Sequence, residues 1–173
     1  GPTFIKFGQI ASTRPDTLPP EFIDELAGLQ DNIPPAPWNE IQAAIEAELG
    51  RPLNQLFLVI DPTPIASASL GQVYAAMLPD QTAVIVKVQR PNIEQTIETD
   101  LGILADLARL AQERLPAAAA IDPVGIVQEF SESLRSELDY RGEARNTDRF
   151  RANFAKEEYV YAPKVYWEYT TRR

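Results

Sequence analysis

The stretch from Pro64 to Val88 constrains the fold of this chain more than any other part of the sequence. Residues 72–78 are compatible with a strand, and the Pro-Asp-Gln sequence that follows them is typical of a turn. Residues 83–88 are then almost continuously apolar, with Lys87 as the exception. The pattern predicts a β-hairpin whose second strand carries one lysine near its end. Because a buried ammonium group is costly without an anion, we expect a carboxylate or an anionic ligand beside Lys87, or else a lysine that reaches solvent from the sheet edge.

The composition excludes several classes of function. The 173 residues include 16 basic and 25 acidic side chains, and the net charge of −9 disfavours nucleic acid or an anionic membrane surface as a partner. The sequence has no cysteine and no histidine, which excludes disulfides, thiolate metal sites and histidine bases. No apolar run approaches the roughly 20 residues of a membrane-spanning helix. An apolar fraction of 45% supports a folded core, so we expect a soluble, intracellular type of domain.

Proline-rich joints divide the first third of the chain into predicted helices. Residues 3–12 have apolar side chains at helical spacing, with Lys6 and Gln9 together on the opposite face. Gly8 lies between them and indicates either close approach of another segment or an indifferent position on a solvated face. Further apolar stripes predict helices over residues 22–30 and 38–49, the second capped by Gly50.

Helical spacing resumes after the hairpin. One stripe predicts a helix over residues 93–115. Another predicts a long, charge-rich helix over residues 123–151, with Asp122 at its N-terminus. Residues 159–169 are aromatic and favour a strand. A small sheet accompanied by separate helices predicts an α+β fold.

The predicted elements follow the order of a protein-kinase small lobe. Val84-Ile85-Val86-Lys87 stands where the V-A-I-K motif of kinases would lie, and an alanine-rich segment replaces the glycine-rich loop. Four ordered segments extend the similarity: Phe4-Ile5-Lys6-Phe7-Gly8-Gln9 with the pattern K-x-G-Q, the loop Ala66–Ser69, Val86-Lys87-Val88-Gln89-Arg90-Pro91, and Glu137-Leu138-Asp139-Tyr140 with the pattern E-x-D, followed by Glu143-Ala144 and Asn146. On these motifs the chain resembles the UbiB (aarF-domain) family of atypical kinases, which is associated with prenylquinone biosynthesis.

The resemblance implies an architecture for the whole chain. Residues 1–50 would be a helical extension that carries the K-x-G-Q motif. Residues 51–173 would be a kinase-like small lobe, an antiparallel sheet plus a main helix, with an inserted helix. We expect this lobe to be truncated before its last strand and the large lobe to be absent.

The resemblance also implies a nucleotide site. Lys87 would hold phosphates and pair with an acid of the main helix, for which Glu143 is the first choice and Glu137 the alternative. The phosphate loop would consist of Ala66, Ser67, Ala68 and Ser69. Alanine restricts the backbone more than glycine does, so we expect altered phosphate geometry and weakened protein-kinase activity. The alternative for this loop is a plain turn of small residues.

The resemblance also implies a regulatory role for the first predicted helix. The helix that carries the K-x-G-Q motif in the family lies over the place where a protein substrate would bind. Lys6, Gly8 and Gln9 would belong to an inhibitory lid. Either Glu137 or Asp139 would hold Lys6 there through a charge-assisted hydrogen bond.

Two similarities to catalytic motifs are rejected. Asp148 and Asn153 have the spacing of a kinase catalytic loop, and Asp100-Leu101-Gly102 imitates the metal-binding D-F-G. The imitations occur in the reverse of the kinase order and lie within helical patterns. We therefore assign no catalytic base and no metal ligand in this chain, and expect ATP or ADP with Mg²⁺ held mainly by the large lobe.

The implied parent protein is an atypical kinase or ATPase in ubiquinone- or plastoquinone-type biosynthesis or its regulation. One alternative is an inactive pseudokinase, a nucleotide-binding scaffold for lipid-pathway partners. Another is a helical interaction module unrelated to nucleotide, in which Lys87 would have no acidic partner. We expect nucleotide and proteins of the lipid or prenylquinone pathway as partners. The expected location is the cytoplasm or the stromal or matrix side of an organelle, peripheral to a membrane through segments outside this chain.

Overall fold

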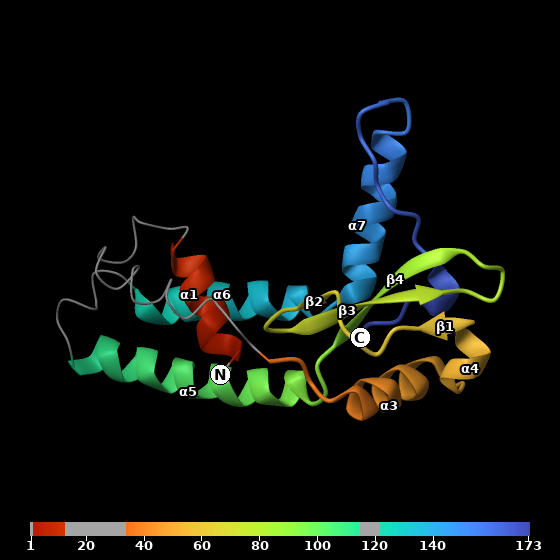
Figure 1. The fold of residues 1–173 in the computed structure, drawn as a ribbon. Helices are drawn as coiled ribbons and strands as arrows, with labels where there is room; N and C mark the ends of the chain where they lie inside the picture. The colour runs from red at the N-terminus through yellow and green to blue at the C-terminus, as the bar shows by residue number, and fades with distance from the viewer. Residues whose placement is uncertain (1, 13–33, 115–121) are drawn as a thin grey trace.

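The computed structural model describes residues 2–12, 34–114 and 122–173 (Figure 1). The helices are α1 (Pro2–Ser12), α3 (Trp38–Leu49), α4 (Leu53–Leu56), α5 (Ile93–Arg114), α6 (Pro123–Glu137), α7 (Tyr140–Asn153) and a 3-10 helix (Trp167–Tyr169). The strands are β1 (Val59–Ile60), β2 (Ala66–Ser67), β3 (Gly71–Met77) and β4 (Ala83–Gln89). The α+β prediction is confirmed. The predicted helix over residues 22–30 lies outside the described residues.

The predicted hairpin is confirmed as β3 and β4, and β3 is the centre of the sheet. It pairs antiparallel with β1, β2 and β4. Val73 lies opposite Lys87, and Gly71 lies opposite Gln89. In the connecting turn Gln81 has φ 68°, and the Asp80 carboxylate accepts a hydrogen bond of 3.0 Å from the Thr82 N–H.

One hydrophobic core lies between the sheet and the helices that precede it. Ile41 of α3, Leu56 of α4 and Tyr74 of β3 are completely buried there. The rings of Trp38 and Tyr74 are 5.2 Å apart. Burial of one such side chain contributes about 1.5–3 kcal/mol. The helix α3, which the sequence places in the extension, thus shares the core of the sheet, and the boundary at residue 50 stays a prediction.

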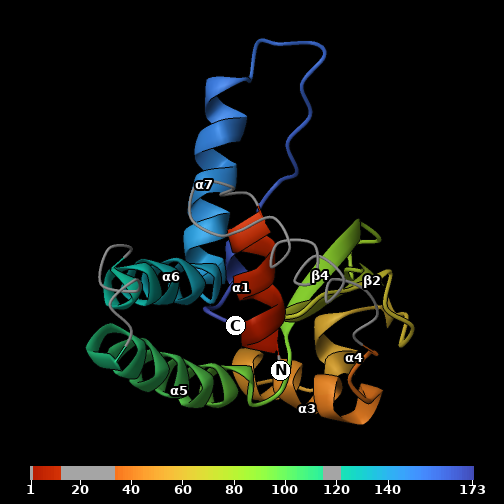
Figure 2. The ribbon, with the colours of Figure 1, turned by 90° about the vertical axis from the view of Figure 1, so that its left-hand side faces the viewer.

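A second hydrophobic core joins the helices α1, α5 and α6. The α5–α6 pair buries Ile97 and Leu134 completely. The helix α1 crosses this pair (Figure 2), where the rings of Phe7 and Phe130 meet edge to face with centroids 5.1 Å apart. The predicted N-terminus of α6 is confirmed, since the Gly125 N–H donates to the Asp122 carboxylate at 3.2 Å.

Two predictions for the C-terminal half are wrong. The long helix over residues 123–151 is two helices, α6 and α7, and the chain turns sharply between them (Figure 1). The apolar stripe of α6 ends at Leu138, which is buried in the α5–α6 core, whereas α7 buries only Ala144 among its described residues. Residues 159–169 form coil and the short 3-10 helix rather than a strand. Aromatic residues favour a strand only where a neighbouring strand supplies hydrogen bonds and packing.

Candidate functional site

A groove of about 1230 Å³ lies between the alanine-rich loop, the end of β4, α1 and the junction of α6 with α7. Residues 66–71 form one wall. Lys6 and Lys87 reach the groove from α1 and β4, and Glu137 and Glu143 reach it from α6 and α7. The groove therefore brings together most of the site residues that the sequence predicts.

Lys87 pairs with Glu143 in this groove. Its ammonium nitrogen lies 2.6 Å from Glu143 Oε2, and the two side chains are 43% and 53% exposed. An ion pair of this exposure contributes at most about 1 kcal/mol to stability, so its consequence is mainly the position of the ammonium group. Of the two acids that the sequence left open for Lys87, the structure places Glu143 beside it. The contact also contradicts the expectation of an unpaired Lys87 that accompanied the interaction-module hypothesis.

Lys6 pairs with the other acid. Its ammonium nitrogen lies 2.8 Å from Glu137 Oε2, and the two side chains are 22% and 37% exposed. Asp139, the alternative partner, instead accepts a hydrogen bond of 3.0 Å from Arg145. The Gly142 N–H and, after it, Arg145 hold the pKa of Asp139 below its usual range. The helix α1 is thereby fixed to α6 beside the groove. Gly8 and Gln9 are described only as part of the α1 backbone, so their predicted roles stay predictions.

The alanine-rich loop has a conformation that alanine tolerates. Ala66 and Ser67 form β2 and pair with Val73 and Gln72. Left-handed φ values among the described residues occur at Gly50, Gln81, Asn92 and Asp122, and not in this loop. The loop thus lacks the positive φ that glycine supplies in phosphate loops.

Tyr140 is a site residue that sequence reasoning missed. The Lys87 ammonium lies 4.6 Å above the centre of its ring. Burial raises the pKa of the Tyr140 hydroxyl, and the charges of Glu143 and Glu137 raise it further. A Cβ built on Gly71 would clash with the Tyr140 hydroxyl and would lie 2.7 Å from the Val88 carbonyl oxygen. The only signal in the sequence was the position of Tyr140 directly after E-x-D.

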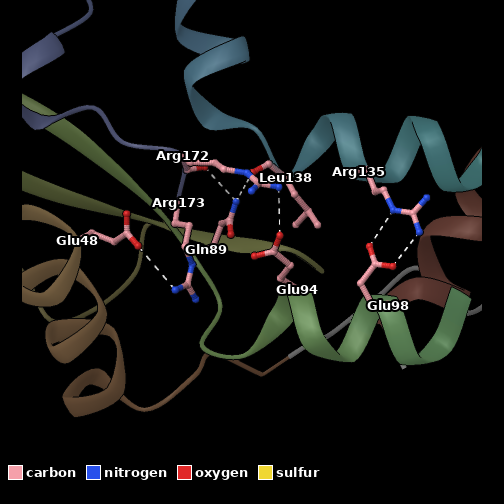
Figure 3. Close-up of polar contacts among 8 residues, drawn as sticks. All are labelled: Glu48, Gln89, Glu94, Glu98, Arg135, Leu138, Arg172 and Arg173. Atoms are coloured by element: carbon pink, nitrogen blue, oxygen red, sulfur yellow. Dashed lines mark hydrogen bonds and ion pairs between the residues drawn. The ribbon is translucent and has the colours of Figure 1, made fainter. Parts of the chain in front are cut away.

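Gln89 fixes the junction of α6 and α7 to the end of β4 (Figure 3). Its buried amide nitrogen donates to the Leu138 carbonyl oxygen at 2.5 Å and to that of Arg172 at 3.3 Å. Its backbone N–H donates to the Arg173 carbonyl oxygen at 3.0 Å. Because Leu138 follows Glu137 directly, these bonds set the position of the acidic segment relative to Lys87.

Two ion pairs brace this junction from outside, and a third joins α6 to α5 along their length (Figure 3). Arg172 and Arg173 reach Glu94 and Glu48 at 3.1 and 3.7 Å. Arg135 binds both oxygens of Glu98 at 2.8 and 2.7 Å, joining α6 to α5.

Comparison with known proteins identifies the family. The profile of the ABC1 atypical kinase-like domain matches residues 28–173. The chain belongs to the ABC1 atypical kinase-like family. A probable protein kinase UbiB of Marinobacter nauticus is 41% identical over 172 residues, which cover 99% of this chain and 31% of that protein. The chloroplastic protein Activity of BC1 Complex Kinase 7 of Arabidopsis thaliana is 43% identical over all of this chain and 25% of its own length.

A solved structure supports the kinase-like fold of this ABC1 domain. The complex of Rv3197 from Mycobacterium tuberculosis with erythromycin matches 91% of this chain and 41% of that one, with a TM-score of 0.62 at 30% identity. The resemblance to UbiB and the kinase-like small-lobe fold are therefore confirmed. The chain spans about a third of the length of the bacterial relative that it matches.

The residues of the rejected motifs of this ABC1 domain do not line the groove. Asp148 and Asn153 are in α7, and the Asp148 carboxylate accepts a hydrogen bond of 2.7 Å from the Trp167 ring N–H. Asp100 is within α5. In the described ranges no three acidic side chains cluster as metal ligands, and no helix of those ranges is long and apolar enough to cross a membrane.

Proposed function

We propose that this ABC1 domain binds the phosphates of ATP or ADP in the groove beside Lys87, as the nucleotide-binding part of an atypical kinase or ATPase. The ion pair between Lys87 and Glu143 carries the proposal. It holds a cation at the wall of an open groove, and the Lys87 side chain remains 43% exposed there, which leaves it accessible to a ligand. An ammonium group held in this way acts as a point charge for phosphate oxygens.

The residues present fit such a ligand. Lys87 would meet the phosphates, Glu143 and the Tyr140 ring would keep the ammonium in place, and residues 66–69 would form the wall beside them. The absence of left-handed φ in that wall supports a phosphate geometry that differs from the glycine-rich loop of protein kinases. Bound Mg²⁺ would supply charge neutralisation at the phosphates, mainly through ligands outside this chain.

We further propose that α1 is an inhibitory lid with Lys6 as its attachment point. The 2.8 Å ion pair with Glu137 and the contact between Phe7 and Phe130 both hold this helix beside the groove. Occupation of this side of the groove would hinder a protein substrate while leaving Lys87 open to nucleotide.

The wider role that we propose is in ubiquinone- or plastoquinone-type biosynthesis or its regulation. It rests on the relatives whose names are probable protein kinase UbiB and the chloroplastic Activity of BC1 Complex Kinase 7. A scaffold that binds nucleotide without transferring phosphate, together with partners from the lipid pathway, is the second candidate. The ion pair between Lys6 and Glu137 favours this candidate, because α1 held beside the groove would restrict the access of a protein substrate.

The test is nucleotide binding by the full-length protein that contains this domain. We expect Lys87→Met to weaken ATP and ADP binding at least about tenfold. Lys164→Met is the matched control, because Lys164 also lies 4.6 Å over a tyrosine ring, that of Tyr166, but does not line the groove. Equal nucleotide affinity in wild type and Lys87→Met would overturn the proposal. ATP hydrolysis measured on the same protein separates the enzyme from the scaffold.

A further inference from the structure

Arg90 lies directly after β4 and donates hydrogen bonds to several separate segments of the chain. Its Nε donates to the Ala68 carbonyl oxygen at 2.9 Å. Its Nη2 donates to the Ser67 hydroxyl at 2.8 Å and to the Pro34 carbonyl oxygen at 3.0 Å. Its backbone N–H donates to the Leu70 carbonyl oxygen at 3.0 Å.

These contacts join two walls of the groove that are far apart in the sequence. Ser67 and Ala68 line the groove from the loop, and Pro34 lines it from the segment before α3, whereas Arg90 is not among the lining residues. The side chain therefore acts on the groove through the two segments that it holds. A planar guanidinium group suits this task because its N–H groups point in several fixed directions.

Backbone hydrogen bonds to β3 also hold the loop. Residues 65–68 are exposed, so packing in the core does not define their positions. The strand β2 is only two residues long. The Ser67 hydroxyl also accepts a hydrogen bond of 3.4 Å from the Gln72 amide, which in turn accepts one of 3.2 Å from the hydroxyl of completely buried Tyr74. Arg90 thus adds a charged anchor to a loop that β3 holds from one side.

We propose that Arg90 is a positioning residue that sets the width of the phosphate groove by joining the alanine-rich loop to the Pro34 segment. The inference rests on the proposed nucleotide site. It adds Arg90, which is not part of the ion pair between Lys87 and Glu143. Without the guanidinium group the loop moves away from Pro34, and the groove loses the fixed distance between its wall and Lys87. Lysine does not replace Arg90, because one ammonium group cannot occupy the positions of both Nε and Nη2.

The experiment compares Arg90→Lys and Arg90→Met with wild type in the full-length protein. The first measurement is hydrogen exchange of the Ala68 N–H, which donates to the Gly71 carbonyl oxygen at 2.9 Å, in the nucleotide-free protein. The second is the affinity for a fluorescent ATP analogue. We expect about tenfold faster exchange at Ala68 and about tenfold weaker binding in Arg90→Met, with Arg90→Lys closer to Arg90→Met than to wild type.

Arg135→Met is the matched control. Arg135 also donates through Nε and Nη2, but to Glu98 between α5 and α6, so its loss should leave the Ala68 exchange and the ATP affinity unchanged. If Arg90→Met does not fold, the exchange at Ala68 and the affinity for the ATP analogue are measured on Arg90→Lys and Ser67→Ala instead. Unchanged exchange at Ala68 in the Arg90 variants overturns the positioning role. A wild-type protein that binds no nucleotide overturns the proposed function instead, and the exchange measurement still decides whether Arg90 holds the loop.

Discussion

The ammonium group of Lys87 and the carboxylate of Glu143 meet at 2.6 Å, although 56 positions separate them in the sequence. The contact joins the end of β4 to the first turn of α7, and the Tyr140 ring lies beneath it. The position of the Lys87 ammonium group in the groove therefore depends on how α7 is attached to β4.

Glu143→Gln should weaken nucleotide binding without destabilising the protein. The variant keeps the size of the side chain but removes the charge that holds Lys87, so we expect a decrease in ATP affinity of about three- to tenfold. The free energy of unfolding should change by less than about 1 kcal/mol because the pair is half exposed. Titration calorimetry and thermal unfolding measure both effects. Asp106→Asn, which removes the partner of Arg109 on α5, is the control, and equal losses of affinity in both variants would contradict the prediction.

Lys6→Ala should release α1 from α6. We expect ATP hydrolysis or autophosphorylation by the full-length protein to increase, because the ion pair with Glu137 no longer holds the lid beside the groove. Lys6→Arg preserves the charge and should behave like wild type. Lys156→Ala removes an exposed lysine elsewhere and should have no effect. A Lys6→Ala protein with unchanged nucleotide handling would count against the lid.

Gly71→Ala should destabilise the hairpin. The new Cβ would clash with the Tyr140 hydroxyl and with the Val88 carbonyl oxygen, and the second clash is with backbone that cannot move alone. We expect a decrease of about 1–3 kcal/mol in the free energy of unfolding, as for overpacked sites. Gly102→Ala is the opposite control, since nothing lies within 4 Å of its Cβ on α5. That variant should gain about 0.5–1 kcal/mol, and a destabilised Gly102→Ala would show that this reasoning fails.

Ala68→Gly tests the effect of alanine on the phosphate loop. Greater backbone freedom should change the ratio of ATP to ADP affinity and increase autophosphorylation. Ala152→Gly, at an exposed position of α7, controls for the general effect of a glycine. An unchanged nucleotide preference together with unchanged autophosphorylation would indicate that the loop is only a turn of small residues.

The pair of Glu98 with Arg135 should stabilise the protein only above acidic pH. Hydrogen bonds from Arg135 lower the pKa of Glu98 against the opposing effect of burial. The unfolded chain therefore binds the proton more readily, so the contribution is complete above an ordinary carboxyl pKa of about 4.3 and is lost as the pH falls through the lower folded value. Thermal unfolding of wild type and Glu98→Gln should differ slightly at pH 7 and converge near pH 3. A constant difference across this range would refute the assignment.

Local sequence was sufficient for the elements whose residues interact with near neighbours. The hairpin at β3 and β4, the helices α3 and α5, and the start of α6 at Asp122 follow from turn residues, apolar spacing and caps. The break between α6 and α7 did not follow, because the apolar stripe runs through Leu138 and only its burial against α5 shows where the first helix ends.

The sequence by itself determined that one lysine lies near the end of the second strand of the hairpin and that acidic residues follow on later helices. Only the tertiary structure decided which acid meets which lysine. Gln89 holds the Leu138 carbonyl oxygen at the end of β4, and this bond places Glu137 toward Lys6 and Glu143 toward Lys87. The contacts of Arg90 with Pro34 and Ala68 depend on the same folding of distant segments. Such pairings are set by how helices and sheet pack, which no spacing along the chain encodes.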